Sequence, residues 1–82
     1  MMELQEILQQ VTEIFRSVLQ KPELILEEDT TAADVDGWDS LSNIQLITSV
    51  EKHFGIKFKL REILKLKNVG ELCTSVQKKV ED

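Results

Sequence analysis

The residues best placed to do chemistry lie together in the segment Gly37-Trp38-Asp39-Ser40-Leu41. A loop glycine precedes it and an apolar pattern with helical spacing follows, so the segment delivers a serine hydroxyl to the first turn of a helix. Free backbone N–H groups and the positive end of the helix dipole favour a phosphate at such a place. A purely structural role is also open, because serine and aspartate are both common helix N-caps.

Three amphipathic patterns and one short segment surround this serine. Apolar side chains recur every three or four residues from Glu3 to Gln20, from Ser40 or Leu41 to Phe54, and from Asn68 to Val80. Residues 57–65 have mixed periodicity, and we expect an extended start followed by a short helix. The spacing from Asn68 to Glu71 also predicts a capping box at the last helix.

The ends of the helices and the loop between the first two can also be predicted. Lys21-Pro22 is expected to end the first helix and Gly55 the second. The loop from Lys21 to Asp39 is unusually long, and such loops are often functional. Its apolar cluster Leu24-Ile25-Leu26 is expected to pack across the helices.

These patterns predict an all-α fold, a four-helix bundle with three longer helices, one short helix and a long first loop. A chain of 82 residues has room for one modest core, so we expect a single domain over residues 1–82. Leu46, Val50 and Phe54 form an expected core stripe, and Cys73 on the last helix is expected to be a buried, unreactive thiol.

Composition narrows the class of protein. Apolar residues make up 41% and charged residues 30%, as in globular proteins, and the net charge of −5 favours basic protein partners over nucleic acid or membranes. The single cysteine excludes an internal disulfide and indicates a reducing compartment. With no signal-peptide pattern or long apolar run, we expect a cytoplasmic protein.

Catalytic and metal sites find no support in the residue pattern. The only histidine, His53, lies thirteen residues after Ser40, or about 20 Å along one helix, so the two cannot form a catalytic pair. An EF-hand with Gly37 at its sixth position would need carboxylates where Ala32 and Asn43 stand. We therefore expect neither an enzyme nor an EF-hand metal site, while weak binding of a divalent ion by the acidic residues of the loop stays open.

The sequence resembles the acyl carrier protein family over nearly the whole chain. The match consists of the motif Asp39-Ser40-Leu41, the loop start Lys21-Pro22-Glu23, the helix end Phe54-Gly55-Ile56, and Asn68-Val69-Gly70-Glu71-Leu72 at the last helix. The tripeptide alone is common by chance, but its place between a long loop and a helix ending in Phe-Gly-Ile makes the combination specific.

The resemblance implies that a separate phosphopantetheinyl transferase joins 4′-phosphopantetheine from coenzyme A to Ser40. Acyl groups would then travel as thioesters on the arm between acyl-activating, acyl-transfer or condensing enzymes. Asp39 would help the transferase bind metal and coenzyme A, unless it is only a cap, and Leu41 would lie beside the arm. The carrier would be a monomer.

Four residues are expected to contact partner enzymes: Trp38, Leu41, Ile44 and Thr48. Leu41 and Ile44 would otherwise belong to the core. The ring of Trp38 is expected either against the apolar cluster of the loop or beside the arm.

The charges depart from those of the family's fatty acid synthesis members, in which the second helix is acidic. Here Glu51 is its only acidic residue, while residues 57–67 are basic and the acidic residues gather in the loop. This favours a specialised pathway over general fatty acid synthesis. An aminoacyl or peptidyl carrier stays open, as does an unmodified helical adaptor in which Ser40 could be replaced by alanine.

Overall fold

The helices of the computed structural model, which describes residues 2–81, lie close to where the sequence pattern predicts them. The four α-helices are α1 (Leu4–Leu19), α2 (Ser40–Phe54), α3 (Leu60–Lys65) and α4 (Val69–Glu81). A short 3₁₀ helix, η1 (Ala32–Asp34), interrupts the long loop, and the described residues contain no strand. The predicted all-α bundle is confirmed; that it is a single domain stays a prediction.

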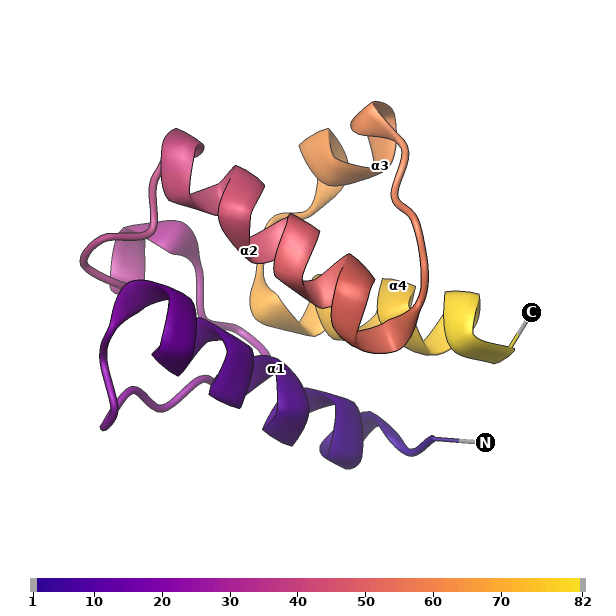
Figure 1. Ribbon diagram of the computed structural model, residues 1–82, viewed down its shortest axis with the longest axis horizontal. Coiled ribbons are helices and arrows are strands. Elements are labelled where there is room, and N and C mark those ends of the chain that lie inside the picture. The colour runs from indigo at the N-terminus through magenta and orange to yellow at the C-terminus, as the bar shows by residue number, and fades with distance from the viewer. Residues whose placement is uncertain (1, 82) are drawn as a thin grey trace.

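The three longer helices build the core. Figure 1 shows α1 running antiparallel to both α2 and α4, with α3 beside α2 on the side away from α1. Helix α1 packs against both α2 and α4, and it buries Ile7, Val11 and Phe15. The buried apolar side chains are Ile7, Val11, Phe15, Leu26, Val35, Leu46, Ile47, Val50, Val69, Leu72, Cys73 and Val76. Phe54, expected in the core stripe, is only half-buried at its edge.

Helix α1 ends by a different device from the predicted one. Gln20 adopts the left-handed conformation (φ 55°), and the N–H groups of Gln20 and Lys21 donate back to the carbonyl oxygens of the last turn. Pro22 lies two residues beyond this stop. Gly55 ends α2 as predicted, at φ 68°, where glycine avoids the steric cost of a side chain.

The long loop is attached to the N-terminus of α4. The N–H of Val69 donates to the carbonyl of Thr30 (2.9 Å), and the N–H of Gly70 donates to the carbonyl of Glu28 (2.7 Å). Two donors that a helix start leaves without intrahelical partners are thereby satisfied. A Cβ on Gly70 would lie 2.7 Å from the Glu28 oxygen, so this close approach depends on glycine.

One expectation about the loop needs correction, and one short helix within the loop was not predicted. Leu26 is buried and Leu24 half-buried, but Ile25 is 73% exposed, because this stretch is not helical and adjacent side chains point in different directions. Helix η1 was not predicted. Its signal is the capping box in which the N–H of Thr31 donates to Asp34 Oδ2 (3.0 Å).

The cap of α4 is formed only in part as predicted. The N–H of Glu71 donates to Asn68 Oδ1 (2.8 Å), as in a capping box. The carboxylate of Glu71, however, accepts from the N–H of Lys67 (2.8 Å) instead of that of Asn68. The reciprocal bond is therefore displaced by one residue toward α3.

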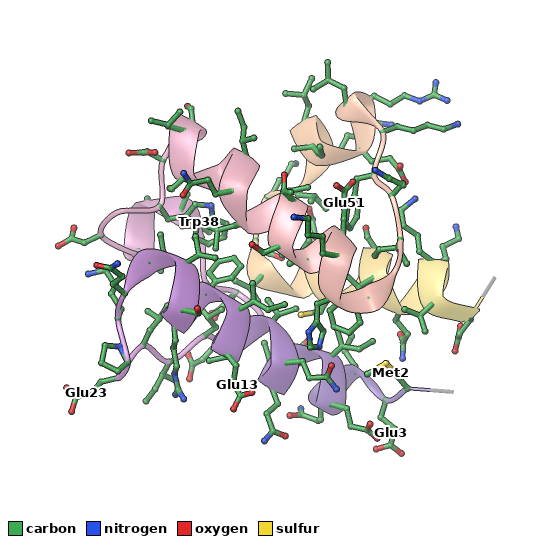
Figure 2. The ribbon with its side chains drawn as sticks, in the orientation of Figure 1. Met2, Glu3, Glu13, Glu23, Trp38 and Glu51 are labelled. Atoms are coloured by element: carbon green, nitrogen blue, oxygen red, sulfur yellow. The ribbon has the colours of Figure 1, made fainter. Side chains whose placement is uncertain are left out.

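Helix α3 is held by polar contacts at its N-terminal side and by Ile63, which packs against the core. Glu62 accepts from the N–H of Lys59 (2.7 Å) and pairs with Lys79 of α4 (2.9 Å). Glu51 Oε2 accepts from the N–H of Phe58 (2.7 Å), and Figure 2 shows the Glu51 side chain beside the connection between α2 and α3. The only acidic side chain of α2 thus has a structural role that sequence reasoning missed.

Candidate functional site

Asp39 is the N-cap of α2. Its Oδ1 accepts hydrogen bonds from the N–H groups of Leu41 (3.0 Å) and Ser42 (2.9 Å). The donor groups, that of Ser42 first, hold the pKa of Asp39 below its ordinary value of 3.8. The structural role considered for Asp39 is therefore present, and it uses Oδ1 without occupying Oδ2.

Ser40 is the first residue of α2 and not its cap. Its side chain is exposed, and within residues 2–81 its hydroxyl makes no hydrogen bond. The alternative that Ser40 serves as N-cap is wrong, because the preceding carboxylate has that position. The expectation of free backbone donors for a phosphate is also only partly correct, since Asp39 occupies those of Leu41 and Ser42.

The turn before Ser40 is fixed by its own polar groups. The Ser42 hydroxyl donates to the carbonyl of Gly37 (2.6 Å) and accepts from the N–H of Asp39 (2.9 Å). Gly37 has φ 89°, a conformation that favours glycine. These contacts hold the Ser40 backbone in a defined orientation while the hydroxyl stays accessible.

Trp38 lies between the start of α2 and α1 (Figure 2). Its ring meets Phe15 edge to face, with 4.9 Å between centroids and 87° between planes, and its Nε1 donates to Asn43 Oδ1 (2.9 Å). The contact with Phe15 of α1 was not among the two places expected for this ring, and the ring also packs against the core, to which Leu26 of the loop belongs. The same side chain lines a cavity beside Ser40.

This cavity has a volume of about 380 Å³ and lies between α2, α3 and the start of α4. Ser40, Asn43 and Ile47 line it from α2, and Ile63 and Leu66 from the α3 side. An exposed hydroxyl at the edge of a partly apolar hollow leaves room for a group attached to Ser40 to lie beside α2 and α3. The residues therefore fit a covalently attached prosthetic group.

The remaining predicted contact residues lie on the exposed side of α2. Leu41 is 74% and Ile44 65% exposed, so the alternative that they belong to the core is wrong. Thr48 is exposed, and its hydroxyl donates to the carbonyl of Ile44 one turn earlier. The structure thus places three exposed side chains on α2 after Ser40, separated from one another by three and four residues.

Cys73 lies on α4 within the hydrophobic core of the protein, with no exposed surface. Burial, with a smaller contribution from the Glu28 carboxylate, raises the pKa of its thiol from 9.0 to about 12. This burial agrees with the prediction that the Cys73 thiol is unreactive.

Comparison with known proteins decides the family. The family model described as "Phosphopantetheine attachment site" matches residues 9–76. The chain belongs to the phosphopantetheine-binding acyl carrier protein family. Phosphopantetheine is its prosthetic group, as expected. Separately, no helix among residues 2–81 is long and apolar enough to cross a membrane.

Individual relatives of the acyl carrier protein family agree along most of the chain. An acyl carrier protein of Thermosynechococcus vestitus is 34% identical over 76 residues, which cover 92% of this chain and 93% of the relative. The solution structure of a holo acyl carrier protein from Geobacter metallireducens superposes with a TM-score of 0.87 at 48% identity. That alignment covers 92% of this chain and 86% of the solved one.

Proposed function

We propose that Ser40 is the attachment residue for 4′-phosphopantetheine and that the chain carries acyl or related intermediates between separate enzymes. The exposed Ser40 hydroxyl beside the cavity carries this proposal, because Asp39 caps the helix and leaves that hydroxyl without a structural role. The chain acts as a passive carrier and not as an enzyme, in line with the family to which it belongs.

The attachment step needs little from the chain beyond access and orientation. A phosphopantetheinyl transferase joins Ser40 Oγ to the phosphorus that bears pantetheine in coenzyme A, the hydroxyl proton goes to a base of the transferase, and adenosine 3′,5′-bisphosphate leaves. Asp39 Oδ2 would be available to a metal ion held by the transferase, while Oδ1 keeps the helix capped. When bound, the arm supplies a terminal thiol that holds cargo as a thioester.

The proposed pathway is a specialised one and not general fatty acid synthesis. Helix α2 has one acidic residue, Glu51, and it bonds to the backbone of Phe58, so α2 offers little negative charge to a basic partner. Trp38, Leu41, Ile44 and Thr48 are the proposed contacts for acyl-activating, acyl-transfer or condensing enzymes. We expect a cytoplasmic monomer. The net charge of −5 disfavours nucleic acid and anionic membranes as partners.

Intact-mass spectrometry tests the attachment. The protein is incubated with coenzyme A, Mg²⁺ and a broad-specificity phosphopantetheinyl transferase, alongside Ser40→Ala and Ser17→Ala variants; Ser17 is an exposed serine of α1. We expect a gain of one phosphopantetheine on the wild type and on Ser17→Ala, and none on Ser40→Ala.

Circular dichroism of each variant controls for folding, and peptide mapping locates the modified serine. A gain on Ser40→Ala would move the attachment to another residue. No gain on any protein, with a control carrier modified in the same reaction, would support the unmodified adaptor.

A further inference from the structure

The segment of residues 57–67, here called the basic segment, opposes the charge of the rest of the molecule. It carries a net charge of +4 in a chain whose net charge is −5. Its five basic side chains are all exposed: Lys57, Lys59, Arg61, Lys65 and Lys67. A protein that used only its overall negative charge to attract partners would not concentrate cations on one exposed helix and its flanks.

Two large apolar side chains stand among these cations. Leu60 is 72% and Leu64 76% exposed, and they are four residues apart on α3, so both lie on one face of the helix. The inner side of α3 is formed by Ile63, which packs against the core. Exposed leucines rimmed by charged groups are typical of protein interaction surfaces.

The contacts that anchor α3 leave this outer surface available. Glu62, the only acidic residue of the basic segment, pairs with Lys79 of α4. That is the one ion pair among residues 2–81, so none of the five cations is neutralised by a salt bridge within the described chain. Lys67 also lines the cavity beside Ser40, so the surface continues to the edge of that cavity.

We propose that Leu60, Leu64 and the surrounding cations form a docking surface for a protein partner that presents an apolar patch edged by carboxylates. The inference rests on the proposed function in taking this partner to be an enzyme that acts on the arm. A partner seated here reaches the cavity edge at Lys67, and with it the neighbourhood of Ser40. Charge complementarity then selects acidic partners and rejects basic ones.

Two other occupants are less favoured, the first by charge and the second by symmetry. An anionic membrane would attract the basic segment but would repel the remainder of the chain, whose acidic side chains include Glu27, Glu28 and Asp29 in the loop. A second copy could offer exposed Ile25 beside those acids. Such a head-to-tail contact joins two different surfaces and leaves each free to bind another copy, which produces open chains.

Nuclear magnetic resonance of the ¹⁵N-labelled Ser40→Ala protein tests the proposal without any arm. The probe is an amphipathic helical peptide with a leucine stripe flanked by glutamates, and the comparison peptide has lysines in place of the glutamates. We expect the glutamate peptide to shift amide signals of residues 57–67, with an affinity that falls as salt rises. The lysine peptide is expected to leave them unchanged.

Matched charge reversals locate the contact. Arg61→Glu with Lys65→Glu should weaken binding of the glutamate peptide roughly tenfold. Lys52→Glu with Lys78→Glu, two exposed cations outside the segment, gives the same net charge and should change affinity less than about twofold.

Several results would overturn the docking surface. These are equal binding of both peptides, no shift in residues 57–67, or equal loss of affinity in the two double variants. Signal loss in residues 57–67 on phosphatidylglycerol vesicles would assign the segment to a membrane, and self-association in sedimentation at low salt would assign it to a second copy. Failure here leaves the mass result for Ser40 unchanged, so the two proposals are tested separately.

Discussion

Asp39 and Ser40 have separate roles at the start of α2. The Asp39 carboxylate satisfies the N–H groups of the first turn, and Ser40 projects an exposed hydroxyl from the next position. The proposed modification at Ser40 would therefore use a hydroxyl that makes no hydrogen bond within residues 2–81. A serine that capped the helix itself would lose part of that cap on acquiring a bulky phosphodiester.

The thiol of Cys73 and the terminal thiol of the proposed arm are expected to differ in reactivity. Burial raises the pKa of Cys73 to about 12, so at pH 8 the folded apo protein is expected to show no thiol that reacts with Ellman's reagent. After loading, one reactive thiol is expected in the folded protein, from the arm. In guanidinium chloride the counts rise to one for apo and two for holo protein, because unfolding exposes Cys73.

Two results would contradict this account of Cys73. A fast-reacting thiol in the folded apo protein would mean that the side chain is accessible. Stability that stays constant from pH 9 to pH 11 would contradict the raised pKa, because the neutral thiol stabilises the fold below pH 9.0 and this contribution is lost as pH rises toward about 12.

At the scale of elements, α3 depends on one carboxylate. Hydrogen bonding by the N–H of Lys59, followed by the bond to Lys79, lowers the pKa of Glu62 below its ordinary value of 4.5. Its stabilising effect is therefore present above pH 4.5 and is lost as pH falls through the lowered value. We expect amide protection factors in α3 to drop over that range.

The Glu62→Gln variant should show the low protection in α3 already at pH 7, with little further change on acidification. Glu13→Gln on the exposed side of α1 is the control and should behave like the wild type. Equal protection of α3 in Glu62→Gln and wild type at pH 7 would show that apolar contacts alone hold this helix.

The hydrogen bonds that attach the loop to the start of α4 lead to a prediction about Gly70. Alanine in place of a helical glycine ordinarily stabilises a helix by about 0.5–1 kcal/mol. Here the new Cβ would lie 2.7 Å from the Glu28 carbonyl oxygen, a backbone atom, and such overpacking costs about 1–3 kcal/mol. Gly70→Ala should therefore lower the free energy of unfolding, measured with urea.

Ser75→Ala, further along α4, is the reference for helix propensity alone and should be neutral or slightly stabilising. Stabilisation by Gly70→Ala equal to that of Ser75→Ala would mean that the loop moves away from α4 without cost.

At the scale of the whole molecule, stability depends on one aromatic side chain. Phe15 has no exposed surface and joins α1 to the core and to Trp38. Phe15→Ala should cost about 3–5 kcal/mol, which approaches the total stability of about 5–15 kcal/mol typical of a domain. We expect a large fall in the midpoint of thermal unfolding.

Ile25→Ala is the matched control, because Ile25 is a large apolar residue that is 73% exposed, and its change should stay within about 0.5 kcal/mol. A Phe15→Ala protein as stable as Ile25→Ala would show that the core does not depend on the contact between Phe15 and its neighbours.

Much of this architecture follows from local patterns in the sequence. The periodic apolar residues predict α1, α2 and α4 within about one residue, and Gly55 marks the end of α2. Contacts between distant residues leave no such pattern, which is why the bonds from Glu51 to Phe58 and from Gly70 to Glu28 were not predicted. At the site, the motif predicts Ser40, but only geometry separates its hydroxyl from the cap formed by Asp39.

The position of Trp38 gives the molecule an internal optical probe. The chain has one tryptophan and no tyrosine, and that tryptophan lines the same cavity as Ser40. Its indole N–H donates to Asn43 Oδ1 and its ring meets Phe15 edge to face, so its emission comes from the region between α1 and the start of α2. Selective excitation of this tryptophan therefore reports on changes at the proposed attachment point in real time, without an added label.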